Sequence, residues 1–275
     1  MSTEVLLDGD RLRRRLVDDG PYAALDVVAV TGSTNSDLSE AAAKGGADRT
    51  VLIAEEQSAG RGRLQRRWVS PRGSGLFVSV LLRPGVPPSA VSWMPLIAGV
   101  ALAETVERTT SVPAGLKWPN DLLLGSGDDW FKGAGILSEA VAGSDGIALV
   151  LGMGVNIRQQ RDELPAGAGG LPATSLAAEG AEVDREEFAV ALLESLAEVE
   201  GRWREADGDV VPTGLLDRYR RLCRTLGQRV RVELGDHDLR GVAEDVDSGG
   251  RLVVRADDGR TSEVSAGDVV HIRPS

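Results

Sequence analysis

The sequence has 275 residues, of which 42% are hydrophobic and 27% charged, enough for one large domain and one small one. Its net charge of −11 argues against a DNA duplex or an anionic membrane as a partner, and we expect neither. One cysteine and two histidines exclude an internal disulfide and a metal centre built from these residues, and with no evident signal peptide or membrane-length apolar run we expect a cytoplasmic protein.

The N-terminal part of the chain predicts a helix, a strand and a second helix. Residues 8–20 have the pattern of a short surface helix, residues 26–30 that of a strand, and residues 35–44 that of a helix. Ser33 or Thr34 is suited to cap the second helix. A helix N-terminus with spare hydroxyl and amide groups also suits a polar ligand, so these two residues are candidates for either role.

An arginine-rich loop follows a buried strand predicted at residues 51–54. Residues 60–63 read Gly-Arg-Gly-Arg, and residues 66–68 read Arg-Arg-Trp. Glycine frees the backbone and each guanidinium presents planar, bidentate donors, so this loop can close over an anion. A Gly-Arg-Gly-Arg run alone is more typical of a solvated basic loop or a nucleic-acid patch. In an acidic protein, however, a local basic site suits a small anion better than a duplex.

Lysine usage singles out two further stretches. Only three of the 31 basic residues are lysines, namely Lys44, Lys117 and Lys132. An ammonium is a compact point charge whose reach and proton affinity differ from those of a guanidinium. Residues 117–121 read Lys-Trp-Pro-Asn-Asp, and residues 132–137 read Lys-Gly-Ala-Gly-Ile-Leu. We therefore expect the lysines of these two stretches to serve the chemistry of a site.

The sequence pattern in the middle of the chain predicts core helices and strands around a candidate ligand cleft. Pro95 falls within the second turn of an apolar helix and would kink it. Pro119 interrupts extended structure next to Lys, Asn and Asp, which is typical of a ligand cleft. Asn156 ends the second strand of a hairpin. The expected elements are strands over residues 75–82, 115–118 and 121–124, a helix over 89–110, and hairpin strands over 134–141 and 147–155.

The C-terminal half predicts a loop, two helices and a small barrel. Residues 158–173 lose periodicity and carry glycines and prolines, so we expect a mobile loop and a candidate lid. Amphipathic spacing predicts helices over residues 185–205 and 213–224. Short alternating strands with Gly-Gly and Asp-Gly turns then predict a small β-barrel. Its expected strands are residues 229–234, 239–245, 252–256, 261–264 and 269–272.

The Gly-Arg-Gly-Arg, Lys-Trp-Pro-Asn-Asp and Lys-x-Ala-Gly-Ile-Leu stretches together resemble the bacterial biotin–protein ligases, and the resemblance extends over residues 25–273. That family joins biotin to ATP as biotinyl-5′-AMP and transfers biotin to one lysine of a carrier protein. The resemblance implies an α+β fold: a class II aminoacyl-tRNA-synthetase-like biotin/lipoate ligase catalytic domain, with a mixed sheet and flanking helices, and a C-terminal SH3-like β-barrel. It assigns residues 1–24 to an N-terminal helical segment, 25–225 to the catalytic domain and 226–275 to the barrel.

The resemblance also indicates which partners to expect. Some relatives carry an N-terminal winged-helix domain and repress transcription; residues 1–24 are too short for one, so we expect a monofunctional ligase that binds no DNA. The expected carrier is the biotin carboxyl carrier protein domain of an acyl-CoA carboxylase, and the expected assembly a monomer or weak homodimer. Two alternatives remain open: a lipoate–protein ligase, which shares the catalytic fold, and a non-enzymatic biotin-sensing regulator.

The resemblance finally implies roles for individual residues. Lys132 and Arg63 would be catalytic, and Asp121 would hold Mg²⁺ beside ATP. Trp68 is either a ligand wall or core, and no tryptophan after the 158–173 loop is placed to stack on adenine. Biotin would contact Ser33, Thr34, Asn35, Gln57, Gly60, Arg61, Gly62, Arg63, Lys132 and Gly135. ATP and the adenylate would contact Arg61, Arg63, Arg66, Lys117, Asn120, Asp121, Lys132 and Asn156. Gly133 departs from the larger apolar residue that many relatives carry after the lysine.

Overall fold

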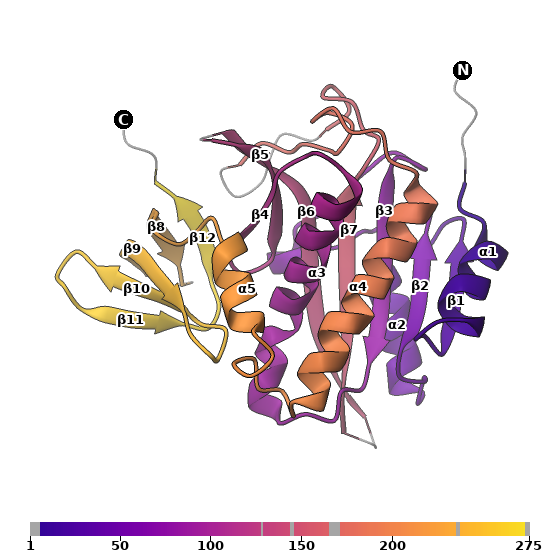
Figure 1. Ribbon diagram of the computed structural model, residues 1–275, viewed down its shortest axis with the longest axis horizontal. Helices are drawn as coiled ribbons and strands as arrows, with labels where there is room; N and C mark the ends of the chain where they lie inside the picture. The colour runs from indigo at the N-terminus through magenta and orange to yellow at the C-terminus, as the bar shows by residue number, and fades with distance from the viewer. Residues whose placement is uncertain (1–5, 128, 144–145, 165–170, 235–236, 273–275) are drawn as a thin grey trace.

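The main body of the structure is a seven-stranded mixed sheet with helices on both faces (Figure 1). The computed structural model describes residues 6–127, 129–143, 146–164, 171–234 and 237–272. The strand order is β1-β2-β3-β7-β6-β5-β4, in which β1 and β2 are parallel and the other neighbours antiparallel. The strands are β1 (Ala24–Val28), β2 (Thr50–Ala54), β3 (Gly75–Leu82), β4 (Ala114–Lys117), β5 (Asp121–Ser126), β6 (Asp129–Gly143) and β7 (Gly146–Asn156).

Helices cover both faces because the central strands are apolar on both sides. All eight residues of β3 are buried. On one face lies α2 (Thr34–Ala43), whose Leu38 and Ala42 pack in a small cluster with Leu81 and Val150. On the other face, α3 (Met94–Thr109) and α4 (Arg185–Glu205) lie side by side over the sheet (Figure 1). The predicted mixed sheet with flanking helices is confirmed.

The core helix α3 differs from its prediction at its start. A 3₁₀ turn, Pro88–Trp93, precedes it, so Pro95 lies in the first helical turn, where a missing N–H costs no hydrogen bond. The predicted kink in the second turn is therefore wrong. The helical stretch Pro88–Thr109 is also long and apolar enough to cross a membrane, contrary to our expectation, but 67% of its most apolar window is buried inside the fold. Its apolar surface forms the core between the sheet and α4.

Shorter helices lie at the two ends of the seven-stranded sheet. At the N-terminus, α1 (Gly9–Arg13) is capped by the Asp8 carboxylate and continues as a π-helical turn, Arg14–Asp18. Leu12 and Leu16 of this segment are fully buried. Near the C-terminal sheet lies α5 (Leu215–Leu222), within the span predicted for it. The helices predicted from amphipathic spacing are thus present.

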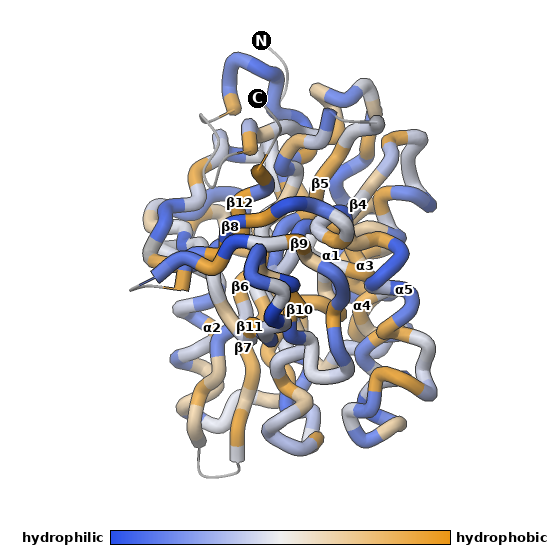
Figure 2. The backbone as a smooth tube through the Cα atoms, turned by 90° about the vertical axis from the view of Figure 1, so that its left-hand side faces the viewer, coloured by the Kyte–Doolittle hydropathy of each residue, from blue (hydrophilic) through white to orange (hydrophobic). Residues whose placement is uncertain are grey.

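A second, antiparallel sheet follows α5, with strand order β11-β10-β9-β8-β12. Its strands are β8 (Arg229–Glu233), β9 (Asp238–Val246), β10 (Leu252–Ala256), β11 (Thr261–Val264) and β12 (Asp268–His271). Buried valines alternate with polar residues along β8, and hydrophobic and hydrophilic segments alternate in this part of the tube (Figure 2). The small C-terminal β-domain is confirmed; the boundaries 1–24, 25–225 and 226–275 stay a prediction.

The small sheet is anchored to the main body by two tryptophans. The indole N–H of Trp93 donates to the Ser248 carbonyl (2.7 Å), and that of Trp118 to the Gly250 carbonyl (3.0 Å). Both rings are about 1% exposed, and the Trp118 hydrogen bond is buried, where a polar contact is stronger than in water. The turn between β9 and β10 is therefore fixed against the start of α3 and the end of β4. This contact holds β8 and β12 beside the sheet edge at which β4 and β5 meet.

A buried ion pair joins α4 to the strand that leads into the arginine loop. Arg185, the first residue of α4, and Glu55, directly after β2, are 1% and 3% exposed in their side chains, and they meet at 2.6 Å. Arg185 also donates to the Gly75 carbonyl (3.1 Å), and Glu55 accepts from the backbone N–H of Leu7 (2.6 Å). One pair thus ties four segments of the fold together.

We expect Glu55→Ala to destabilise the fold by about 3 kcal/mol, because it removes the carboxylate that faces a buried guanidinium. The measurement is the free energy of unfolding in urea, compared with wild type. Glu198→Ala is the matched control: it breaks an exposed pair with Arg202 and should cost less than about 1 kcal/mol. Equal losses in the two variants would contradict the structural role assigned to Glu55.

Candidate active site

One cavity of about 400 Å³ opens between the main sheet and the C-terminal sheet, and it gathers almost every predicted site residue. All of them line it except Gly60. They come from the start of α2, the arginine loop, the break between β4 and β5, and strands β6 and β7. The lining members are Ser33, Thr34, Asn35, Gln57, Arg61, Gly62, Arg63, Arg66, Lys117, Asn120, Asp121, Lys132, Gly135 and Asn156.

The polar end of the cavity is built at the N-terminus of α2. Ser33 occupies the N-cap position but makes no side-chain capping hydrogen bond, so capping does not account for its hydroxyl. Gln57 Oε1 accepts from the backbone N–H of Thr34 (2.8 Å) and lies 3.2 Å from the Thr34 hydroxyl. Ser33, Thr34 and Asn35 are each at most 4% exposed. A buried set of neutral hydrogen-bonding groups suits an uncharged polar ligand.

Glycines at two adjacent strands make room for side chains on the sheet. A Cβ on Gly152 would lie 2.1 Å from the Asn35 side-chain oxygen. Cβ atoms on Gly135 and Gly154 would lie 2.9 and 2.7 Å from the Trp68 ring. Trp68 therefore packs against β6 and β7 and lines the cavity, and its role as a wall for the ligand stays a prediction. Within the described residues its buried indole N–H has no hydrogen-bond partner.

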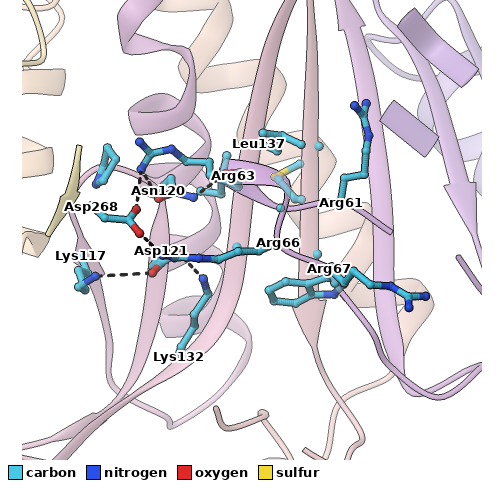
Figure 3. A pocket seen from close by; sticks show the side chains of 18 of the residues that line it. Arg61, Arg63, Arg66, Arg67, Lys117, Asn120, Asp121, Lys132, Leu137 and Asp268 are labelled. Carbon is cyan, nitrogen blue, oxygen red and sulfur yellow. Dashed lines mark hydrogen bonds and ion pairs between the residues drawn. The ribbon is translucent and has the colours of Figure 1, made fainter. Parts of the chain in front are cut away.

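The opposite end of the cavity is charged and centres on Asp121. Lys132 Nζ lies 2.6 Å from Asp121 Oδ1, and Lys117 Nζ lies 3.9 Å from Oδ2 (Figure 3). Asn120 donates to the Ile136 carbonyl (2.9 Å) and accepts from Arg63 (3.2 Å). Burial lowers the pKa of Lys117, a shift that Asp121 opposes and Lys132 reinforces.

A β-bulge directs Lys132 into this cluster. The register between β5 and β6 shifts at this point, since Leu122 pairs with Ala134 but Leu123 pairs with Lys132. Gly133 is the extra residue, and a Cβ there would lie 2.5 Å from the Leu124 side chain. The Lys132 backbone also bonds to residues 172–174. Of the predicted loop 158–173, residues 165–170 lie outside the described part, and the lid stays a prediction.

The arginine loop is held by carboxylates on two sides. Arg63 and Arg66 both pair with Asp268 of β12, and Arg63 donates to the Gly267 carbonyl as well (3.2 Å). Arg61 instead pairs with Glu139 of β6 (2.9 Å). In Figure 3 the Arg61 side chain points away from the cluster of Arg63, Asp121 and Lys132. The loop thus spans the cavity from the catalytic sheet to the C-terminal sheet.

Several lining residues were not predicted from the sequence. They are Arg67, Val69, Ile136, Leu137, Met153, Leu171, Arg231, Glu233, Asp268, Val269 and Val270, together with the glycines on β7. The residues from β8 and β12 could not be recognised from the sequence around them, because they reach the cavity only through the docking of the small sheet. The three acidic members, Asp121, Glu233 and Asp268, face seven Lys and Arg residues in this cavity.

Asn156 lies at the end of β7 with both ends of its amide engaged. Its nitrogen donates to the Thr174 carbonyl (2.9 Å), and its oxygen accepts from Gln159 (3.2 Å). It is 3% exposed and lines the cavity between the charged end and the 171–173 segment. Asn156 therefore stabilises this wall as well as facing the ligand space.

Of the three carboxylates among the described residues that line this cavity, Asp121 lies in the lysine cluster and is the candidate ligand for a divalent cation. Among the described residues no three His, Cys, Asp or Glu side chains cluster as a metal site. Asp121 Oδ1 is buried and, despite its ion pair with Lys132, makes no hydrogen bond within the described residues. A carboxylate oxygen with a lone pair to spare fits Mg²⁺, which takes one or two protein carboxylates and draws its remaining ligands from phosphate and water. The residues present fit a metal that arrives with a nucleotide.

Sequence comparisons identify both parts of the chain. Residues 27–156 match the biotin/lipoate A/B protein ligase family, and residues 225–272 match the biotin protein ligase C terminal domain. The chain is 42% identical to the biotin–(acetyl-CoA-carboxylase) ligase of Mycobacterium tuberculosis, covering 97% of this chain and 96% of that protein. It is 31% identical to the bifunctional ligase/repressor BirA of Salmonella typhimurium, covering 92% of this chain and 74% of that protein.

Solved structures agree with the sequence matches. The biotin protein ligase from Aquifex aeolicus in complex with biotin and ATP superposes with a TM-score of 0.75 at 27% identity, covering 92% of this chain and all of that one. A mutant of that ligase in complex with biotin superposes with a TM-score of 0.74 at 26% identity, again covering 92% of this chain and all of that one. By sequence and by fold, this chain belongs to the biotin protein ligase family.

Proposed function

We propose that the protein activates biotin with ATP to biotinyl-5′-AMP and then transfers biotin to a lysine of a biotin carboxyl carrier domain. The observation that carries this proposal is a single cavity with a neutral, hydrogen-bonding end, apolar sides and a cationic end. Biotin and ATP present those three kinds of surface in the same order. The relatives named as biotin ligases, and the Aquifex complex with biotin and ATP, support the same activity.

Biotin fits the part of the cavity between α2 and β7. Its ureido group would meet the hydroxyls and amides of residues 33–35 and Gln57, and its aliphatic chain would lie along Leu137 and Met153. The carboxylate would then point toward Lys132, beside Trp68, whose ring lies 5.8 Å from the ammonium. On this geometry we propose that residues 33–35 and Gln57 contact biotin.

The cationic end serves the adenylation step. One carboxylate oxygen of biotin attacks the α-phosphorus of ATP, and the bond to pyrophosphate breaks. Negative charge grows on the transferring phosphoryl group, so fixed cations that face it lower the barrier. Lys132 sits where carboxylate and phosphate would meet, while Arg63 and Arg66 reach the same space from the loop. Phosphate would replace Asp268 as the partner of Arg63.

Asp121 would hold Mg²⁺ together with ATP phosphate oxygens, and the metal would neutralise part of the triphosphate charge. Lys117 supports the same phosphates from behind Asp121. Burial lowers the pKa of Lys117, and a phosphate nearby would oppose that shift by favouring the charged ammonium. Asn120 keeps Arg63 beside this group through its side-chain oxygen. These four residues form the phosphate half of the proposed site.

Transfer requires a lysine amine of the carrier to attack the adenylate carbonyl, with AMP as the leaving group. The expected carrier is the biotin carboxyl carrier protein domain of an acyl-CoA carboxylase, in line with the names of the relatives. We further propose a cytoplasmic protein that acts as a monomer or weak homodimer, with the catalytic domain at residues 25–225. Nothing in the proposed chemistry calls for DNA.

Mass spectrometry of the small-molecule products tests the proposal. Purified protein mixed with biotin, ATP and Mg²⁺ should yield AMP-linked biotin, and adding a carrier domain should give biotinylated carrier. Replacing biotin with lipoate distinguishes a biotin ligase from a lipoate ligase, because a lipoate ligase would adenylate lipoate in preference to biotin. Binding of biotin without any adenylate would indicate a regulator instead.

Lys132→Ala should slow adenylate formation by about a hundredfold, or ~3 kcal/mol, because it removes a cation that faces the charge developing in the transition state. Single-turnover formation of the adenylate measures this loss. Lys44→Ala, which removes an exposed ammonium, is the control and should match wild type. Turnover close to wild type in Lys132→Ala would refute the role given to this residue.

Arg63→Gly should still make the adenylate but release it, because Lys132 and the metal remain to stabilise the transition state. Escaped adenylate acylates exposed lysines, so biotin incorporation into an unrelated lysine-rich protein should rise about tenfold or more, on the scale of losing a charge-assisted hydrogen bond. Arg67→Gly controls for added loop flexibility, since Arg67 points away from the cluster (Figure 3). Equal adenylate production without extra labelling would show that the loop does not retain the intermediate.

A further inference from the structure

Glu139 lies behind the wall of the cavity and touches two parts of the site at once. It stands on β6, opposite Val150 of β7, and does not itself line the cavity. One oxygen, Oε2, accepts a hydrogen bond from the Asn35 amide nitrogen (2.8 Å) and from the Arg61 guanidinium (2.9 Å). Asn35 belongs to the polar end, and Arg61 belongs to the arginine loop. A residue outside the cavity thus contacts two groups that face into it.

The contact with Glu139 fixes which way the Asn35 amide faces. Its nitrogen is next to two groups that only accept hydrogen bonds, the Glu139 carboxylate and the Leu137 carbonyl (3.3 Å). Its oxygen lies 2.7 Å from the Ser79 hydroxyl. A flipped amide would place its oxygen against a carboxylate, where like charges repel. Glu139 therefore selects one of the two orientations of this buried side chain.

The Asn35 amide is one link in a chain of buried hydrogen bonds. The Ser79 hydroxyl is fully buried and lies 2.7 Å from both the Asn35 oxygen and the Thr34 hydroxyl. Its single proton goes to Asn35, so its oxygen accepts from the Thr34 hydroxyl, and Gln57 keeps the backbone N–H of Thr34 (2.8 Å). Gly152, opposite Ser79 on β7, leaves the space in which the Asn35 oxygen lies. Hydroxyls can rotate, whereas the carboxylate cannot donate. The direction of the whole chain is therefore set at its carboxylate end.

The Arg61 contact is weaker than the Asn35 contact. The Arg61 side chain is 43% exposed, so solvent screens its ion pair with Glu139. Asn35 is 4% exposed, and losing its acceptor there leaves a buried amide N–H with only the distant Leu137 carbonyl. The amide contact is therefore the main consequence of having a carboxylate at this position.

We propose that Glu139 is a positioning residue for biotin, acting through Asn35 to orient the hydrogen-bonding groups that receive the ureido ring. The inference rests on the proposed function, because it takes biotin as the ligand of the polar end. Glu139 contributes to biotin affinity and not to the adenylation step, since it reaches neither Lys132 nor the phosphate residues. Glu139→Gln keeps an acceptor oxygen of the same length for the Asn35 amide and loses the charge pair with Arg61; the Leu137 carbonyl, which only accepts, still disfavours the flipped Asn35 amide.

The test separates biotin affinity from chemistry in the full-length protein. The dissociation constant for biotin is measured by calorimetry, and the rate of adenylate formation by single turnover at saturating biotin. Glu139→Ala should weaken biotin binding about tenfold and leave the single-turnover rate within about threefold of wild type. Glu139→Gln should bind within about threefold of wild type. In an Asn35→Ala background, Glu139→Ala should change affinity less than about twofold, because both act through one contact.

Three controls decide the result. Glu40→Ala removes an exposed carboxylate from the same helix as Asn35 and should bind biotin as wild type does. Thermal unfolding checks the fold of every variant, and Glu139→Gln keeps the comparison valid if Glu139→Ala is unstable. The proposal is overturned by unchanged affinity in Glu139→Ala, by equally weak binding in Glu139→Gln, or by additive losses with Asn35→Ala. Wild-type protein that binds biotin without forming adenylate overturns the proposed function but not this inference, whereas no biotin binding overturns both.

Discussion

The site depends on collecting positive charge in one cavity of an otherwise acidic protein. Seven Lys and Arg side chains and only three carboxylates line this space, although the chain carries a net charge of −11. Like charges at such short range repel, and the fold limits the cost by placing a carboxylate beside each group of cations. Asp121 sits between two lysines, Asp268 faces two arginines, and Glu139 holds Arg61. In the proposed function, a bound phosphate would supply the remaining negative charge.

Backbone geometry makes this concentration of charge possible. The bulge at Gly133 turns Lys132 toward Asp121, and the break at Pro119 brings Lys117 and Asn120 to the same place. Because Gly152 and Gly154 have no side chains, Asn35 and Trp68 can pack closely against the sheet. The C-terminal sheet closes the cavity through β8 and β12. Indole hydrogen bonds to the turn between β9 and β10 anchor this sheet. Its position therefore contributes to the phosphate half of the proposed site.

Much of this arrangement could be predicted from the sequence, because the motifs lie close to the strands and turns that position them. The spans of β3 and α4 agree with the predicted residues 75–82 and 185–205. Pro95 was misjudged, because periodicity alone cannot tell a kink from a helix start preceded by a 3₁₀ turn. Asp268 was missed for another reason: its partner Arg66 lies 202 residues away, and only the docking of two sheets joins them. Glu139 follows the Lys-x-Ala-Gly-Ile-Leu stretch by two residues, yet the role proposed for it rests on strand register and not on neighbouring residues.

The central claim is that the arginine loop and Lys132 exchange protein carboxylates for the phosphate of the adenylate. A crystal structure with a non-hydrolysable biotinyl-adenylate analogue that retains the phosphate tests it most directly. We expect Arg63 and Lys132 within hydrogen-bonding distance of that phosphate, and Asp268 farther from Arg63 than the 3.8 Å that separates them in the free protein. An adenylate phosphate bound away from both residues, with the Arg63–Asp268 pair intact, would contradict it.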